Sequence, residues 1–217
     1  MTTTTTTTAC DPATATTRSL LAYGAVAGPL YVGVSVGLGL TRDGFDFGRH
    51  GWSLLTNGPY GWVQVLNFLL TGLCVVAFAA GLHRAGLGRR VSRLVGAYGV
   101  SLVAAAVLRA DPAQGFPPGT PDHAPVSWHG VAHFAAGAVG FGCLIVACLV
   151  LGRWFAAAGR RGWAAFSRVT GIAFLAAFAG IASGSAGAGV VPAFVAAVLL
   201  VWTYLAALAV HLYRTAS

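Results

Sequence analysis

The sequence contains six long apolar stretches, and their recurrence limits the fold more than any other feature. They occupy residues 19–40, 61–82, 91–108, 128–151, 163–183 and 190–213. A helix of about 20 apolar residues crosses a hydrocarbon core of about 30 Å, because each helical residue advances the chain by about 1.5 Å. We therefore predict an all-α fold over residues 18–215, a polytopic membrane bundle of six transmembrane helices.

Residues 1–17 precede this bundle and include seven consecutive threonines. The segment has neither the charged start nor the apolar core of a secretory signal peptide. It also has too few apolar side chains to pack against a core, so we predict a disordered cytoplasmic tail.

The charged residues are few and strongly biased toward arginine. Of the 217 residues, 57% are hydrophobic and 8% are charged, and the formal net charge is +8. All the cationic side chains are arginines, and most of them lie in the short connections between apolar stretches. A basic chain can bind nucleic acid, but this distribution is typical of a membrane protein instead. We predict the lipid bilayer as a partner and exclude nucleic acid.

The arginines also predict how the bundle is oriented. One side of the predicted bundle carries ten of them, namely Arg18, Arg84, Arg89, Arg90, Arg93, Arg153, Arg160, Arg161, Arg168 and Arg214. The other side carries only Arg42, Arg49 and Arg109. Arginine-rich loops stay in the cytoplasm, so both termini are predicted to be cytoplasmic. Together with the missing signal peptide, this bias favours a multi-pass protein of the bacterial inner membrane.

Small residues recur at four-residue spacing within the apolar stretches. The pairs are Gly24/Gly28, Gly33/Gly37 and Gly180/Gly184. Helices in a bilayer associate through close packing, which such small faces allow. We therefore expect a tightly packed bundle.

The longest polar interruption runs over residues 109–133, between the third and fourth apolar stretches. Ser127 is a suitable N-cap for the fourth helix, which places His129 and His133 on one helical face. Polar residues are expected at the same depth on the second and third helices. We predict an outward-facing polar pocket here, with these candidate ligand-binding residues: His129, His133, Asp111, Arg109, Gln64 and Asn67.

A metal site is the alternative interpretation of the same residues. A helix N-terminus disfavours the imidazolium form, and neutral imidazole is the form that binds metals. Two histidines four residues apart are also the spacing of helical zinc sites, although the glutamate usual in those motifs is absent. With Asp111 as third ligand, His129 and His133 would hold zinc; Asp122, His123 and His50 are other candidates for the third position.

The same region contains a recognisable combination of short motifs. These are Asp111-Pro112, the Gly-Phe-Pro-Pro-Gly run at 115–119, and Ser127-Trp128-His129-Gly130 followed by His133. The combination resembles the DUF998 family of bacterial membrane proteins with six spans. The resemblance covers roughly residues 18–215 and implies that fold, with a long outer loop before the fourth span. It implies no activity and no catalytic residues.

Three functional hypotheses remain open from the sequence. The protein could bind a lipid or small ligand in the outer pocket, or pass it across the membrane. It could instead be a metal-dependent membrane hydrolase in which zinc activates water. In the third hypothesis it is a structural or accessory subunit whose partners supply the activity.

Overall fold

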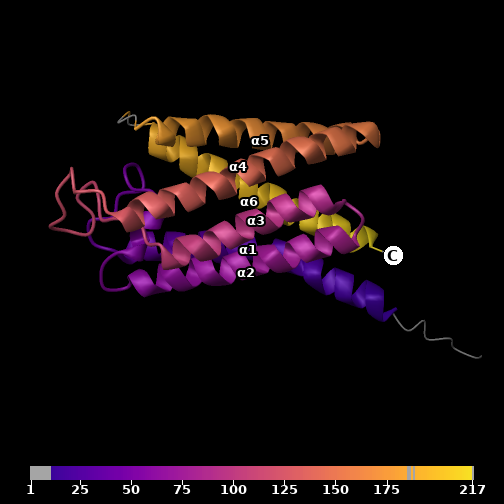
Figure 1. Cartoon of the computed structure of the whole chain (residues 1–217), viewed down its shortest axis with the longest axis horizontal. Helices are drawn as coiled ribbons and strands as arrows, with labels where there is room; N and C mark the ends of the chain where they lie inside the picture. The colour runs from indigo at the N-terminus through magenta and orange to yellow at the C-terminus, as the bar shows by residue number, and fades with distance from the viewer. Residues whose placement is uncertain (1–10, 185–186, 188, 217) are drawn as a thin grey trace, which may run out of the picture.

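Six long helices make up most of the computed structural model, which describes residues 11–184, 187 and 189–216 (Figure 1). All six are long and apolar enough to cross a membrane, and the described residues form no strand. The predicted fold class is therefore confirmed. The elements are α1 (Pro12–Thr41), the 3-10 helix η1 (Trp52–Thr56), α2 (Gly61–Arg84), α3 (Arg89–Val107), α4 (Trp128–Ala157), α5 (Arg161–Ala182) and α6 (Val190–Thr215).

The main difference from the predicted boundaries is at the start of α1. The helix begins at Pro12, so residues 12–17 are helical rather than disordered, whereas residues 1–10 lie outside the described part. Proline is well suited to a first helical position because its missing N–H would have no partner there. The hydroxyls of Thr16 and Thr17 donate to the carbonyls of Pro12 and Ala13, so both hydroxyls have partners within the helix.

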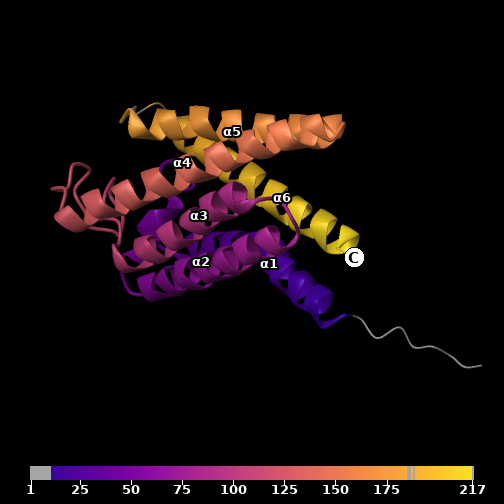
Figure 2. The same cartoon turned by 45° about the vertical axis from the view of Figure 1, so that its right-hand side comes forward.

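The helices pack in a closed ring that follows their order in the chain. Each helix packs against the next one, and α6 returns to pack against α1. Figure 2 shows α6 running diagonally from the end of α5 toward the side of α1, which closes the ring. All six helices can therefore contribute side chains to one common interior.

The crossing of α2 and α3 is a particularly close contact within this ring. A Cβ atom built on Gly72 would lie 2.7 Å from the carbonyl oxygen of Gly99. A Cβ atom on Gly99 would lie 2.8 Å from the carbonyl oxygen of Gly72. The two backbones meet directly, in the way that small residues allow in membranes.

The two ends of the bundle differ in their connections. Both ends of the described chain and the short turns at 85–88 and 158–160 lie at one end, here called the termini end (Figure 1). The turns are tight because Gly86 and Gly159 adopt positive φ values of 81° and 72°, which other residues rarely do. The long connections 42–60 and 108–127 lie at the opposite end, here called the loop end.

The two long connections fold against each other into a cap over the loop end. His50, only 3% exposed, joins them: its Nδ1 accepts from the backbone N–H of Asp46, and its Nε2 lies 2.9 Å from the carbonyl oxygen of Gln114. Since Nδ1 is an acceptor, the ring proton lies on Nε2 and is donated to Gln114. The Arg42 guanidinium lies 5.2 Å from the centre of the Phe116 ring, which is fully buried. This cap covers one end of the bundle interior.

Candidate functional site

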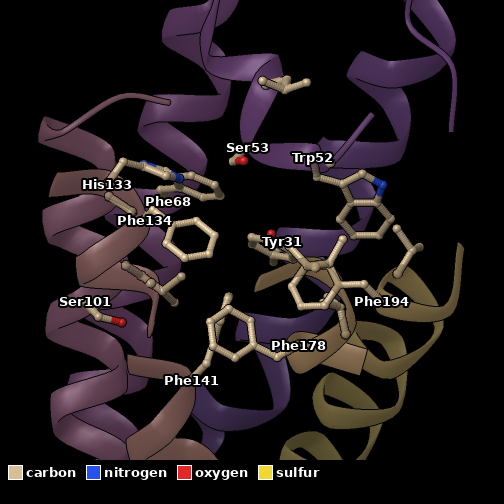
Figure 3. A pocket seen from close by; sticks show the side chains of 18 of the residues that line it. Tyr31, Trp52, Ser53, Phe68, Ser101, His133, Phe134, Phe141, Phe178 and Phe194 are labelled. Atoms are coloured by element: carbon tan, nitrogen blue, oxygen red, sulfur yellow. The ribbon is translucent and has the colours of Figure 1, made fainter. Parts of the chain in front are cut away.

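A cavity of about 360 Å³ lies inside the ring of helices near the loop end (Figure 3). We call it the central cavity. Every helix and the cap contribute to its wall. The contributions include Tyr31 of α1, Trp52 of η1, Phe68 of α2, Tyr98 of α3, His133 of α4, Phe174 of α5 and Trp202 of α6.

The wall of the central cavity is rich in aromatic side chains, and most of the other lining residues are aliphatic. Figure 3 shows Phe134, Phe141, Phe178 and Phe194 around the space, with Ser53 and His133 on the side of the cap. The rings contact one another; for example, Phe141 meets Phe174 edge-to-face at 5.1 Å between centroids. Such a wall suits an apolar molecule, and the polar groups beside the cap could contact one polar end of it.

His133 is the one predicted ligand-binding residue that lines the central cavity. Its Nδ1 lies 2.6 Å from the carbonyl oxygen of Leu108, just beyond the last residue of α3. A carbonyl can only accept, so Nδ1 carries a proton and donates it. In the neutral ring Nε2 is then an acceptor. His133 therefore both joins α4 to the end of α3 and forms part of the cavity wall.

Asp111 holds the start of α4 to the preceding loop. Its carboxylate accepts hydrogen bonds from the backbone N–H and the hydroxyl of Ser127, at 2.6 Å and 2.5 Å. The Ser127 oxygen in turn accepts from the N–H of Gly130, which confirms the predicted N-cap. These bonds from the Ser127 hydroxyl and backbone hold the pKa of Asp111 below its usual range. A side chain at position 130 would collide with the carboxylate, which explains the glycine.

His129 and Arg109 are exposed and lie outside the central cavity. The ring of His129 stacks on that of Trp128, with 3.5 Å between centroids. Within residues 11–184, 187 and 189–216, no group of three His, Cys, Asp or Glu side chains is placed to hold a metal ion. The zinc site at His129, His133 and Asp111 thus stays a prediction, and the positions of these residues lend it no support.

Gln64 and Asn67 belong to a separate buried cluster between α1 and α2. The Gln64 amide donates to the Ser35 hydroxyl at 2.9 Å, and the Asn67 amide donates to the Tyr31 carbonyl at 3.1 Å. Thr71 completes the cluster by donating to the Asn67 carbonyl oxygen. Ser35, Gln64 and Thr71 have no exposed surface. Because these groups bond to one another across α1 and α2, they hold the two helices together. Gln64 and Asn67 do not line the central cavity.

Comparison with known proteins identifies the family. The family model described as "Protein of unknown function (DUF998)" matches residues 25–211, which is most of the chain. The chain belongs to the DUF998 family. No curated protein and no solved structure matches it.

The DUF998 match extends over all six helices, whereas the motifs that carried the resemblance lie at the α3–α4 connection. In this DUF998 protein those motifs have structural roles: Asp111 and Ser127 cap α4, and Phe116 is buried in the cap. Trp202 and the phenylalanines of the cavity wall were not predicted as site residues. The sequence carries no signal for them, because aromatic residues in an apolar span can face either lipid or the interior.

Proposed function

We propose that this protein binds an apolar or amphipathic small molecule, such as a lipid chain, in the central cavity. The observation that carries the proposal is the partly open, aromatic-rich space inside a ring of six membrane-spanning helices. Its volume of about 360 Å³ lies within the range of about 300–1,000 Å³ usual for small-molecule pockets.

The polar groups beside the cap favour one orientation of such a ligand, because the Ser101 hydroxyl, on the other side of the space, already donates to the Tyr98 carbonyl. Ser53 and His133 lie on the cap side of the space, and Phe141 and Phe178 lie on the opposite side (Figure 3). A ligand with a hydroxyl group could therefore donate it to Nε2 of His133 and place its apolar part among the rings. This is a less polar pocket than the sequence led us to expect.

The proposal includes the direction in which the cavity faces. Ten arginines belong to the termini end and three to the loop end. Since arginine-rich ends of membrane proteins stay in the cytoplasm, the termini are cytoplasmic and the cap faces outward. In a bacterial inner membrane, the ligand would then be held on the periplasmic side.

Photolabelling tests the proposal with a probe of suitable size. The purified protein is irradiated with an octanol analogue that carries a diazirine, and the modified residues are mapped by mass spectrometry. Adducts are expected on cavity residues such as Phe141 and Trp202. Mapping separates these adducts from labelling at the lipid-facing surface, for example at Leu175, which is 49% exposed.

Two glycines of α4 provide the blocking variant and its control. Gly137 lines the cavity, so Gly137→Phe would fill part of it. Gly142 faces open space, and Gly142→Phe makes the same change on the same helix outside the cavity. Cavity adducts should disappear in the first variant and persist in the second. Equal labelling of cavity residues in both, or adducts confined to the lipid-facing surface, would contradict the proposal.

A further inference from the structure

A second hollow lies on the outer side of the ring, where α6 is recessed between α1 and the start of α5. It has a volume of about 750 Å³, and we call it the α6 groove. Small residues form much of it, including Gly28 of α1 and Ala206 and Ala207 of α6. Trp202 lines both the α6 groove and the central cavity, so this residue lies between the two spaces.

One end of the α6 groove is cationic. His211 and Arg214 line it from successive turns of α6, three residues apart and therefore on one helical face. Nη1 of Arg160 lies 2.5 Å from Nε2 of His211, which brings a second guanidinium to the same end. The Trp163 ring packs on His211 with 4.8 Å between centroids. Tryptophan prefers the level of the lipid headgroups, so this end lies at the membrane surface.

The positive charge at the termini end is not balanced by the chain itself. Ten of the arginines belong to this end, but Asp11 is its only acidic residue. Across the part of the chain that the structure describes, the single ion pair joins Arg49 and Asp122 at the loop end. A negatively charged partner outside the chain would complement these arginines.

The length of the α6 groove fits one lipid chain. The groove extends along α6 from Leu199 to Arg214, and the apolar part between Leu199 and His211 covers about 18 Å at 1.5 Å per residue. One leaflet of the hydrocarbon core is about 15 Å thick. An acyl chain in this groove would therefore reach the bilayer midplane when its headgroup lies at His211.

We propose that the α6 groove is a binding site for an anionic phospholipid of the cytoplasmic leaflet. One acyl chain lies along Ala206 and Ala207, and the phosphate accepts hydrogen bonds from the guanidinium groups of Arg160 and Arg214. Arginine suits this role because its planar donor pair matches a phosphate. The site is independent of the ligand proposed for the central cavity.

Native mass spectrometry of the protein with added phosphatidylglycerol tests the headgroup contact. The variant Arg160→Gln/Arg214→Gln should bind the lipid roughly 25-fold more weakly, since each arginine close to the acidic headgroup contributes about fivefold to its binding. The control Arg89→Gln/Arg93→Gln removes the same charge at the same end, from exposed positions on α3. It should retain nearly full affinity. Equal losses in the two variants would refute a defined site and indicate diffuse attraction.

Two further comparisons test the acyl chain. Ala207→Phe fills the groove and should release phosphatidylglycerol, whereas Ala196→Phe, at an exposed position of α6 outside the groove, should not. Glycerol phosphate, which has the charge but no chain, should fail to displace the bound lipid at equal concentration. Displacement by glycerol phosphate, or retention of phosphatidylcholine as strong as that of phosphatidylglycerol, would overturn the proposal.

Discussion

The close packing of α2 against α3 predicts opposite effects on stability for two glycine-to-alanine substitutions, Gly72→Ala and Gly96→Ala. In Gly72→Ala the new Cβ would lie 2.7 Å from the Gly99 carbonyl oxygen and 3.1 Å from the backbone nitrogen of Val103. Ordinary contact begins near 3.4 Å, so α2 and α3 must separate by about 0.7 Å. No rotation of a side chain can relieve this contact, because backbone atoms stand on both sides.

The expected cost follows from two opposing contributions. Overpacking of this kind costs about 1–3 kcal/mol, while replacing glycine by alanine within a helix contributes up to about 1 kcal/mol of stability. We expect Gly72→Ala to lose about 1–2 kcal/mol. Gly96→Ala, one turn earlier on α3, places its Cβ at an ordinary 3.6 Å from that of Ala79 and should gain stability.

Thermal unfolding in detergent, followed by circular dichroism, measures both variants. A change of 1 kcal/mol shifts the Tm of a chain of this size by about 2–4 °C, so the two shifts should be resolved and opposite in sign. In the double variant Gly72→Ala/Gly99→Ala the second substitution should cost less than it does alone, because one separation of the helices relieves both contacts. Equal shifts for Gly72→Ala and Gly96→Ala would refute the reasoning.

Three further predictions concern the cap, the buried cluster and the topology. Asp111→Asn should lower the Tm at neutral pH, because it removes the carboxylate that Ser127 stabilises. The pKa of this carboxyl in the folded protein lies below its usual value of about 3.9. The difference in Tm from wild type should therefore persist above about pH 5 and shrink as the pH falls through the folded pKa. A difference in Tm that does not change with pH would argue against a stabilising charge on Asp111. Ser35→Ala removes the acceptor of the Gln64 amide and should cost about 1 kcal/mol, whereas an unchanged Tm would mean that the amide finds another partner. An impermeant maleimide added to spheroplasts should label a cysteine introduced at Asp122 but not one at Ala158. The reverse labelling pattern would show that the protein has the opposite orientation in the membrane.

The helices could be predicted from the sequence because the bilayer sets their length and excludes charge. Five of the six starts were predicted within two residues, and only α1 begins much earlier, at Pro12, where threonine hydroxyls bond back to the helix. The contact between Gly72 and Gly99 was not predicted, since these residues lie on different helices and form no four-residue pair. Gly33 and Gly37, which do form such a pair, face open space.

The candidate site was predicted only in part, because polarity indicates which residues need partners and does not show where the partners are. Asp111, Gln64 and Asn67 satisfy their hydrogen bonds within the protein, with Ser127, Ser35 and Tyr31. Only His133 also reaches the central cavity. Which face of an apolar helix points inward depends on how the helix is rotated against its neighbours. The sequence therefore could not show which aromatic residues line the cavity.

The ring of helices has a consequence for biosynthesis. Each helix from α2 to α5 packs against the one synthesised just before it, so hairpins can assemble while the ribosome is still translating. The contact between α1 and α6 is different, because four other helices separate these two along the sequence. Until α6 is inserted, the wall that holds Trp202 is missing, and the aromatic interior lies open to lipid. The cavity therefore forms only when α6 joins the ring, and a nascent chain that stalls before α6 lacks part of the cavity wall.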